Sequence, residues 1–522
     1  MTAIHRSPFP DVEIPDVPIT AYVFAGVETR ADRIALVDGP SGRCVTYGTL
    51  VDAISRCAGG LAARGIRHGD VVALLAPNLP EYAVVFHGAA RAGAVVTSVN
   101  PTYGPEETRF QLQDANARIL VTVPPCLDTA RAAVDGTAVR EVVVIGEAEG
   151  ATPLTDLLAH DPLGQVAVDP HDLAALPYSS GTTGLSKGVM LTHRNLVANM
   201  VQVLASGVNL QTDERVIGVL PFYHIYGMLV ILNLCLHKGM TIVTMARFDL
   251  EQFLKILQDY QIGRANLVPP IILALAKHPI VDNYDLSHLK IIMSGAAPLG
   301  AELAQACAER LGCLVLQGYG LTETSPVTHV NPEDPARIKL GSVGVPIANT
   351  ECTIVSLETG NPLGVREEGE IWIRGPQVMK GYLNNPDATA QTLTPDGWLR
   401  TGDVGYVDED GYFYIVDRVK EMIKYKGLQI APAELEAVLL THPAVADAAV
   451  IPSPDPEAGE VPKAFVVLKG TVTDHELMEY VAARVAPFKK IRRIEFVEQI
   501  PKSPSGKILR RVLVQQERER AS

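Results

Sequence analysis

A segment rich in glycine and small hydroxyl residues surrounds one cation at residues 178–193, YSSGTTGLSKGVMLTH. The backbone N–H groups and hydroxyls of such a loop can converge on one point, and phosphate oxygens suit this arrangement as acceptors. Lys187 adds a positive charge beside them. The segment therefore indicates a phosphate-binding loop, with a plain solvated turn as the alternative.

This loop is not a Walker A loop, which reads G-x-x-x-x-G-K followed by Ser or Thr. Counted from Gly181, the second glycine of that pattern would fall at position 186, where the chain has Ser186. Lys187 is followed by Gly188, so the magnesium-binding hydroxyl of the pattern is missing as well.

Further short motifs that combine charged, aromatic and small residues follow the loop along the chain. They are YHIYG (223–227), SGAAP (294–298), QGYGLTET (317–324), TGD (401–403), VDR (416–418), KYKG (424–427) and PKSPSGK (501–507). In this order the set resembles the adenylate-forming superfamily, which comprises acyl-CoA synthetases, luciferases and peptide-synthetase adenylation domains. The resemblance extends from about residue 20 to residue 512.

Two stretches are especially similar to the 4-coumarate–CoA ligase branch, RVKEMIKYKGLQIAPAELEAVLLTHPAVADAAV (418–450) and IPKSPSGKILRR (500–511). The resemblance implies two half-reactions that use ATP, Mg²⁺ and coenzyme A. A carboxylate first attacks the α-phosphate of ATP, giving an acyl-adenylate and pyrophosphate, and the CoA thiol then displaces AMP. The protein's task in such chemistry is positioning and charge stabilisation.

The resemblance also implies the nucleotide contacts. Glu323 would hold Mg²⁺, for which a carboxylate is a suitable hard ligand, and Thr322 would contact the adenylate phosphate. Asp403 and Arg418 would bind the ribose hydroxyls. The remaining implied contacts to ATP or AMP are Ser179, Ser180, Gly181, Thr182, Thr183, Gly184, Lys187, Gln317, Gly318, Tyr319, Gly320, Lys420 and Gln429.

Cations near the C-terminus would divide the two half-reactions between them. Lys507 would stabilise the negative charge that develops where the carboxylate meets the α-phosphate, a task that suits a compact ammonium on a long stem. Lys424, Lys426 and Gly427 would serve the CoA step after the C-terminal domain turns about a hinge at Asp417. Arg247 would contact the CoA nucleotide, with an ordinary surface arginine as the alternative.

His224 and a set of small or apolar residues would form the acid-binding pocket. His224 would orient the substrate carboxylate, with a packed core histidine as the alternative. The other implied lining residues are Tyr226, Gly227, Met293, Ala296, Gly320, Pro326 and Val327. Met293 stands where plant enzymes commonly have lysine, and Ala296 where glycine is frequent. Because an apolar pocket discriminates a hydroxyl only weakly, we expect cinnamate and 4-coumarate both to be used.

Short apolar strands alternate with amphipathic helices through most of the chain, as in 71–77 (VVALLAP) and the helical 49–65. This pattern predicts an α/β protein with parallel sheets covered by helices on both faces. From about residue 340 the composition changes to segments rich in glycine, aromatic and β-branched residues, which favour a smaller antiparallel region. We predict an N-terminal adenylation domain at 1–416 and a small, mobile α+β C-terminal domain at 417–522.

Composition limits the other possibilities. A net charge of −14 disfavours nucleic-acid binding, since that depends on clustered cations. Seven scattered cysteines without a C-x-x-C pair fit a reducing cytoplasm. The apolar run at 225–236 is too short to cross a membrane and predicts a buried helix.

Two alternatives stay open at this point. The same chemistry could act on a medium-chain fatty acid or a benzoate, or could transfer the acyl group to a carrier protein. A non-catalytic nucleotide-binding protein is the alternative of another class, and the presence of Lys507, Glu323 and Asp403 disfavours it.

Overall fold

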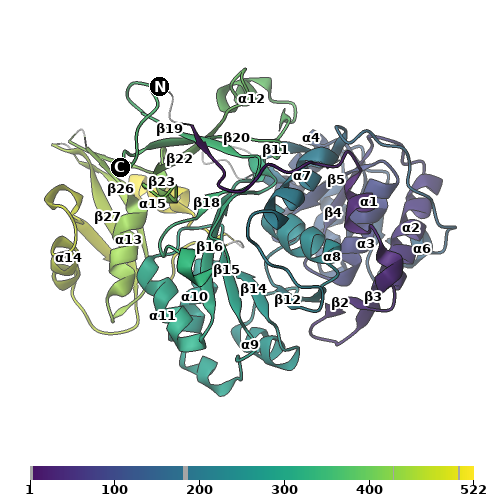
Figure 1. The fold of residues 1–522 in the computed structure, drawn as a ribbon, viewed down its shortest axis with the longest axis horizontal. Coiled ribbons are helices and arrows are strands. Elements are labelled where there is room, and N and C mark those ends of the chain that lie inside the picture. The colour runs from purple at the N-terminus through teal and green to yellow at the C-terminus, as the bar shows by residue number, and fades with distance from the viewer. Residues whose placement is uncertain (1–3, 180–185, 427, 456, 504–505, 522) are drawn as a thin grey trace.

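The structure is a computed structural model that describes residues 4–179, 186–426, 428–455, 457–503 and 506–521. Within these ranges, strands form two nine-stranded sheets and two five-stranded sheets. Figure 1 shows the two large sheets with their helices in the purple to green part of the chain, and the yellow C-terminal elements to one side.

The first large sheet has the order β10-β11-β9-β5-β4-β6-β7-β8, and its ninth strand, β21 (Gly381–Tyr382), pairs with β11. Its flanking strands are β10 (Tyr178–Ser179), β11 (Lys187–Thr192), β9 (Leu173–Ala175) and β8 (Thr152–Pro153). Its centre is parallel and consists of β4 (Val71–Leu75), β5 (Val95–Val99), β6 (Ala117–Thr122) and β7 (Glu141–Val144). Every residue of β4 and β5 is buried, as expected for parallel strands covered on both faces. Helices α2 (Tyr47–Ala63) and α3 (Pro80–Arg91) pack against each other beside this sheet.

The second large sheet has the order β18-β17-β16-β15-β14-β12-β13-β2-β3. Its flanking strands are β18 (Val345–Pro346), β12 (Arg215–Gly218), β13 (Thr241–Thr244), β2 (Ile34–Asp38) and β3 (Cys44–Thr46). Its strands β14 (Arg264–Leu267), β15 (Ile291–Ser294) and β16 (Leu314–Gly320) run parallel, and β17 (Val327–Val330) returns antiparallel to β16. Ligands of α/β proteins usually bind at the carboxyl ends of parallel strands. The motifs at 294–298 and 317–324 lie at these ends.

The apolar run at 225–236 is a buried helix, as predicted, but it begins as a π-helix, η3 (Tyr226–Asn233), and continues as α8 (Leu234–His237). A π-helix is rare and is often found at functional sites. None of the helices in the described ranges has both the length and the hydropathy that crossing a bilayer requires.

The predicted antiparallel region is the sheet β1-β19-β20-β22-β23. It is formed by β1 (His5–Arg6), β19 (Glu351–Val355), β20 (Gly369–Arg374), β22 (Leu399–Val407) and β23 (Phe413–Arg418). The register of β22 and β23 places Asp403 opposite Arg418, which brings the TGD and VDR motifs together.

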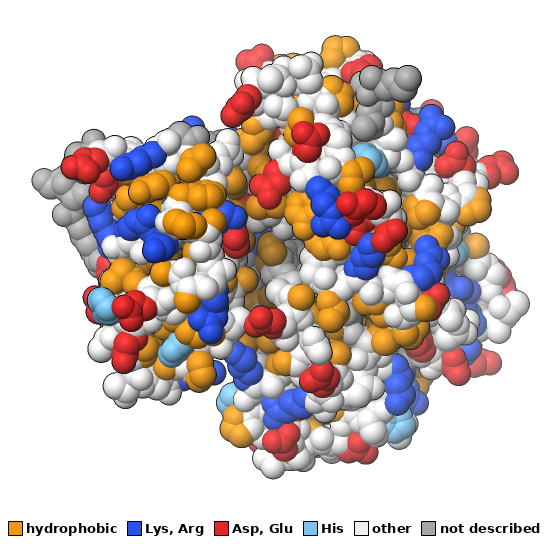
Figure 2. All heavy atoms as spheres, turned by 60° about the vertical axis from the view of Figure 1, so that its left-hand side comes forward, with side chains coloured by type: hydrophobic (Ala, Val, Ile, Leu, Met, Phe, Trp, Pro, Cys, Tyr) orange, Lys and Arg blue, Asp and Glu red, His pale blue; other side chains and the backbone are white. Residues whose placement is uncertain are grey.

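The C-terminal residues form a second, smaller α+β unit with its own apolar cluster. Its sheet contains β24 (Ile423–Tyr425), β25 (Leu428–Ile430), β26 (Val445–Asp455), β27 (Gly459–Leu468) and β28 (Arg493–Phe496). Its helices are α13 (Pro432–Thr441), α14 (Asp474–Ala482) and α15 (Arg510–Ala521). Figure 2 shows a hollow between this unit and the larger part of the molecule. The domain boundary at 417 stays a prediction.

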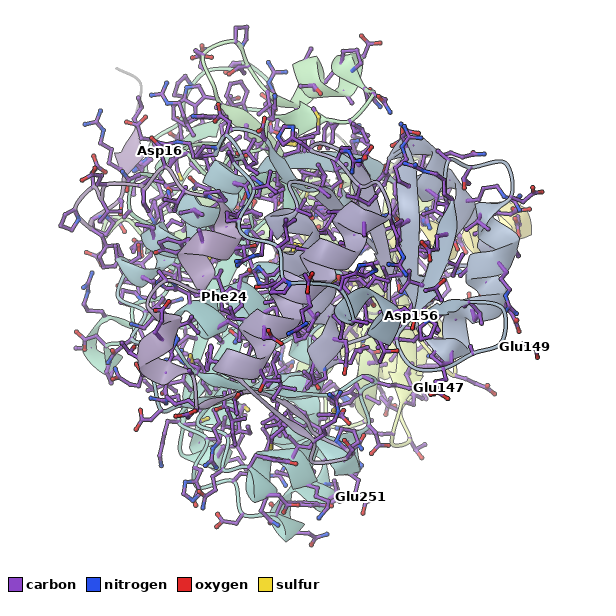
Figure 3. The ribbon with its side chains drawn as sticks, turned by 90° about the vertical axis from the view of Figure 1, so that its right-hand side faces the viewer. Asp16, Phe24, Glu147, Glu149, Asp156 and Glu251 are labelled. Carbon is purple, nitrogen blue, oxygen red and sulfur yellow. The ribbon has the colours of Figure 1, made fainter. Side chains whose placement is uncertain are left out.

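Acidic side chains contribute to the net charge of −14, and several of them lie on the face away from the C-terminal unit. Figure 3 shows Glu147, Glu149, Asp156 and Glu251 projecting from that face, and all four are exposed. A site for anionic ligands therefore depends on local positive charge.

Candidate active site

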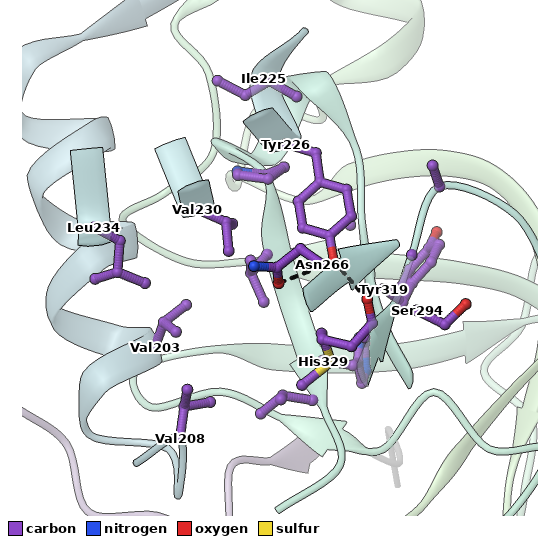
Figure 4. Close-up of a pocket in the computed structure, with 18 of the residues that line it drawn as sticks. Val203, Val208, Ile225, Tyr226, Val230, Leu234, Asn266, Ser294, Tyr319 and His329 are labelled. Atoms are coloured by element: carbon purple, nitrogen blue, oxygen red, sulfur yellow. Dashed lines mark hydrogen bonds between the residues drawn. The ribbon is translucent and has the colours of Figure 1, made fainter. Parts of the chain in front are cut away.

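One cavity lies at the carboxyl ends of β14, β15 and β16, between these strands and η3 (Figure 4). It is lined by most of the predicted acid-binding residues, namely His224, Tyr226, Met293, Ala296, Gly320, Pro326 and Val327. Gly318, Tyr319, Thr322 and Lys507 line the same cavity. His224 and Lys507, which are 283 positions apart in the chain, thus meet at one site.

Gly227 does not line the cavity, in contrast to the prediction. A Cβ atom at this position would lie 2.1 Å from the backbone oxygen of Pro221. The glycine is therefore required for the close approach of η3 to residues 220–221, which lets the helix start with Tyr226 directed at the cavity.

The end of the cavity near η3 combines apolar walls with a small polar group. The Tyr226 hydroxyl donates toward two acceptors, Met293 O at 3.2 Å and Asn266 Oδ1 at 3.4 Å. Figure 4 shows the amide oxygen of Asn266 on the side of Tyr226 and the amide nitrogen on the side of Val230. The apolar walls here are Val203, Val208, Val230 and Leu234. Sequence reasoning missed Asn266, which belongs to none of the motifs.

Arg264 also lines the cavity, but its charge is neutralised. Its guanidinium donates to both carboxylate oxygens of Glu333, at 2.6 and 2.9 Å, and both side chains are buried. Arg264 is therefore not a free positive charge that could bind a second carboxylate.

His224 and Lys507 line the same cavity and lie close enough for their charges to interact. Burial lowers the pKa of His224 to about 3, and the positive charge of Lys507 acts in the same direction. Its Nδ1 accepts a hydrogen bond from the backbone N–H of Tyr226 at 3.3 Å, so Nε2 carries the proton of the neutral ring. Burial also lowers the pKa of Lys507, as does the neighbouring Arg418.

A polar cluster close to Lys507 is formed by Asp403, Arg418 and Tyr319. Asp403 Oδ2 accepts a hydrogen bond of 2.6 Å from the Tyr319 hydroxyl, and Oδ1 lies 3.2 Å from Arg418 Nε. Burial raises the pKa of Asp403, and the guanidinium of Arg418 opposes this effect. The carboxylate retains further acceptor capacity, because two oxygens offer about four lone pairs.

Gln317 lies in the same strand as Tyr319 but has a structural role. Its side chain is buried and exchanges two hydrogen bonds of 3.1 Å with the backbone of Leu299. These bonds fix the segment after β15, and the predicted contact of Gln317 with the nucleotide stays a prediction.

Glu323 and Lys187 are brought together by Tyr382, which the sequence reasoning missed. The Tyr382 hydroxyl donates to Glu323 Oε1 at 2.9 Å, and Lys187 Nζ lies over the tyrosine ring, 4.8 Å from its centre. The two-residue strand β21 (Gly381–Tyr382) places this ring, because it pairs with β11 (Lys187–Thr192). Ser179 pairs with Lys187 in the adjacent β10 (Tyr178–Ser179). Ser180, Gly181, Thr182, Thr183 and Gly184 lie outside the described residues.

The cations predicted for the CoA step do not line the cavity. Lys424 lies opposite Gln429 in the hairpin of β24 and β25, and both are exposed. Lys426, Lys420 and Arg247 are exposed as well. Gly427 lies outside the described residues.

Asp417 is buried at the start of the C-terminal unit. Its carboxylate accepts hydrogen bonds from the backbone N–H groups of Arg418 at 2.7 Å and of Ala433 at 2.9 Å. Since Ala433 lies in the first turn of α13, this side chain links β23 directly to a helix of the C-terminal unit.

Residues 23–383 match the sequence model of a family described as AMP-binding enzyme, and residues 434–507 match that of the AMP-binding enzyme C-terminal domain. The chain belongs to the AMP-binding enzymes. The adenylate-forming family predicted from the motifs is thereby confirmed.

Named relatives of this AMP-binding enzyme cover nearly its full length. It is 46% identical to a 4-coumarate–CoA ligase of Pinus taeda, over 98% of this chain and 97% of that protein. ATP-bound MatB from Rhodopseudomonas palustris has 30% identity and a TM-score of 0.88, over 96% of this chain and 99% of that one. The anthranilate CoA ligase AuaEII in complex with anthranoyl-AMP has 27% identity and a TM-score of 0.89, over 97% and 98% of the two chains. The predicted fold class is confirmed.

Proposed function

We propose that this protein is an AMP-forming acid–CoA ligase whose acid is a cinnamate-type aromatic propenoic acid. The reaction class, ATP-dependent activation of an acid to its CoA thioester, follows from the family and from relatives such as the Pinus taeda enzyme. The observation that supports the proposal best is that His224 and Lys507 line the same cavity, here called the slot, whose other walls are mostly apolar. This arrangement suits a molecule with a carboxylate at one end and an apolar body.

The walls of the slot favour a ring that carries at most a neutral polar group. Asn266 and Tyr226 offer an amide and a hydroxyl to a ring substituent, and the surrounding valines and leucine offer apolar contact. The ion pair of Arg264 with Glu333 leaves this arginine unavailable to the second carboxylate of a dicarboxylic acid. Because neither polar group is charged, a ring without a hydroxyl is tolerated, and we expect cinnamate and 4-coumarate both to react.

In the first half-reaction, the side chains around the slot orient the reactants and stabilise charge. His224 donates its Nε2–H to the substrate carboxylate, and its low pKa keeps the ring neutral in this role. The ammonium of Lys507 stabilises negative charge at the α-phosphate as the new bond forms. Asp403 accepts from the ribose hydroxyls, Arg418 donates to them, and Thr322 contacts the adenylate phosphate.

The phosphate end of ATP would be held by the segment around Lys187 together with Mg²⁺. Mg²⁺ in such sites commonly binds one or two protein carboxylates plus substrate phosphates, so a single Glu323 is a sufficient protein ligand. The hydrogen bond from Tyr382 fixes the orientation of that carboxylate. Bound Mg²⁺ would supply charge neutralisation at the phosphates.

The second half-reaction requires the C-terminal residues to turn, because Lys424 and Lys426 are exposed while Lys507 lies in the slot. We assign the pivot to Asp417, with Lys424, Lys426 and Gly427 brought toward the slot and Arg247 contacting the CoA nucleotide. Lys420 and Gln429 would contact the intermediate in the course of this change.

An assay of pyrophosphate release with a panel of acids, with and without CoA, tests this function. We expect the highest kcat/KM with cinnamate and 4-coumarate, and thioester only when CoA is present. Preference for a fatty acid or a benzoate would reject the assigned substrate class, and absence of release with every acid would reject catalysis.

A further inference from the structure

Arg510 occupies a position that helix stability does not explain. It begins α15 three residues after Lys507, and the first turn of this helix contains no acidic residue. Because the N-terminus of a helix carries partial positive charge, a cation there is unfavourable. Arg511 follows directly and adds to the positive charge. The stabilisation of Arg510 must therefore come from contacts outside its own helix.

Those contacts use three nitrogen atoms of the guanidinium group. Nη1 donates to Glu421 Oε2 at 2.5 Å, Nη2 donates to Glu436 Oε2 at 2.6 Å, and Nε donates to the backbone oxygen of Val450 at 3.2 Å. The second oxygen of Glu436 accepts from the Val450 N–H at 2.7 Å. Only 15% of the Arg510 side chain is exposed, so water screens these charges weakly.

Both carboxylates that Arg510 binds belong to segments next to the site. Glu421 lies in the turn after β23, in which its backbone N–H donates to the carbonyl oxygen of Arg418 at 2.9 Å. The guanidinium of Arg418 pairs with Asp403 beside the slot. Glu436 lies in α13, the helix to which the Asp417 carboxylate is bonded.

Hydrogen bonds join residues 507–509, which directly precede Arg510, to residues 501–503. The backbone N–H of Leu509 donates to the oxygen of Pro501 at 2.8 Å, and Lys502 and Ile508 form a β-bridge. The backbone N–H of Lys507 donates to Ser503 Oγ at 3.1 Å. A shift of Arg510 would therefore move the loop that carries the Lys507 ammonium.

We propose that Arg510 is a positioning residue for the first half-reaction. Its guanidinium holds the Lys507 loop against the Glu421 turn and α13, and this sets the position of the Lys507 ammonium relative to Asp403 and Arg418. Arg510 contacts no substrate. Lysine cannot replace it, because one ammonium lacks the planar fork that binds two carboxylates and a carbonyl at once. The kinetic part of this inference rests on the proposed function.

The variant Arg510→Lys tests the proposal, because it keeps the charge and removes the fork. The matched control is Arg493→Lys, whose arginine bonds Ser453 and Asp455 in the same unit. We expect Arg510→Lys to slow acyl-adenylate formation by about 10- to 100-fold, the effect of a small misplacement of a catalytic group. Thioester formation from supplied cinnamoyl-AMP should be retained, and Arg493→Lys should retain both half-reactions.

A double-mutant cycle with Glu421→Ala tests whether Arg510 positions the Lys507 loop through its ion pair with Glu421. If Arg510 acts through Glu421, the double variant loses no more adenylation rate than the more impaired single variant. Additive losses would mean that the two residues act separately, and they would overturn the proposed path. Equal loss of both half-reactions in Arg510→Lys would indicate general structural damage and would also overturn the proposal.

Hydrogen exchange gives a readout that needs no substrate. Peptides that cover 501–509 should exchange faster in Arg510→Lys than in wild type or Arg493→Lys, while peptides from β4 and β5 should not change. Unchanged exchange at 501–509 would overturn the positioning role. If the wild type activates no acid of the panel, the proposed function fails, and this exchange experiment still decides whether Arg510 holds the loop.

Discussion

The hydroxyl of Tyr382 donates a 2.9 Å hydrogen bond to the carboxylate of Glu323, the residue proposed to hold Mg²⁺. The same ring lies under Lys187 Nζ at 4.8 Å from its centre. A cation and a carboxylate from distant parts of the chain are thus positioned by one aromatic side chain. Lys187 and Glu323 each contact the tyrosine instead of each other. Both charges are therefore available to bind a phosphate and its metal ion.

This relationship predicts that Tyr382→Phe weakens the apparent affinity for Mg²⁺ in adenylate formation. Loss of a hydrogen bond to a metal-binding side chain typically costs about 10- to 100-fold in metal affinity. The measurement is the Mg²⁺ dependence of ATP–pyrophosphate exchange at saturating acid. Tyr412→Phe is the control, since the Tyr412 hydroxyl bonds the backbone of Arg337 instead. An unchanged Mg²⁺ dependence in Tyr382→Phe would show that Tyr382 does not support Mg²⁺ binding by Glu323.

The sequence predicted the parts of the site that lie in motifs. Asp403 and Arg418 were paired from TGD and VDR, and the register of β22 and β23 places them opposite each other. Lys507 was predicted to reach the site, and it lines the cavity. The α/β pattern also gave the parallel strands correctly, because buried parallel strands are continuous apolar runs.

Contacts between distant segments were beyond sequence reasoning. Tyr382 reaches Glu323 only through the pairing of β21 with β11, and Asn266 reaches Tyr226 only because β14 lies beside β15. Gly227 was taken as a lining residue because it follows Tyr226, but its role is a close backbone contact with Pro221. A spacing of residues in the chain does not show which side of a helix faces a cavity.

Lys507→Ala should abolish most acyl-adenylate formation and leave thioester formation from supplied cinnamoyl-AMP largely intact. The reason is that its ammonium lies in the slot while the CoA-step lysines lie outside it. The two half-reactions are measured separately. Lys502→Ala serves as the control, because Lys502 belongs to the same loop but pairs with Asp447 at 2.6 Å. Equal loss of both half-reactions in Lys507→Ala would contradict the division of labour.

Lys426→Ala should have the opposite effect, with adenylation retained and capture of CoA slowed. Lys426 is exposed beside the hairpin of β24 and β25, away from the slot that contains Lys507. Lys469→Ala is a matched control, since Lys469 is an exposed lysine of the same unit. ATP–pyrophosphate exchange and thioester formation are compared in the three proteins. Loss of ATP–pyrophosphate exchange in Lys426→Ala would show that the assignment of Lys426 to the CoA step is wrong.

The fully buried histidines His87 and His329 predict that the protein becomes less stable as the pH falls below about 6.5. Burial lowers the pKa of each to about 3. Each histidine takes up a proton near pH 6.5 when unfolded, so the free energy of unfolding decreases between that pH and about 3, by about 1.4 kcal/mol per pH unit for each histidine. Melting temperatures measured from pH 7 to 5 should fall less steeply for His87→Leu than for wild type. His475→Gln, at an exposed position, should keep the wild-type slope. An equal pH dependence of the melting temperature in His87→Leu and wild type would show that His87 does not contribute to this loss of stability.

Ala296→Gly should shift substrate preference toward bulkier rings without destabilising the protein. Ala296 lines the slot and has a φ of 68°, a left-handed conformation that glycine adopts more readily than alanine. Removing its methyl group therefore widens the slot and relieves backbone strain at the same position. Changes of this size in a pocket typically alter discrimination by about 1–3 kcal/mol. We expect the ratio of kcat/KM for caffeate to that for cinnamate to increase, with a melting temperature equal to or above that of the wild type. The control is Ala297→Gly, the next residue in the chain, which does not line the slot. If both variants leave the ratio unchanged, Ala296 does not limit the width of the ring site, and the assignment of the acid-binding pocket must be revised.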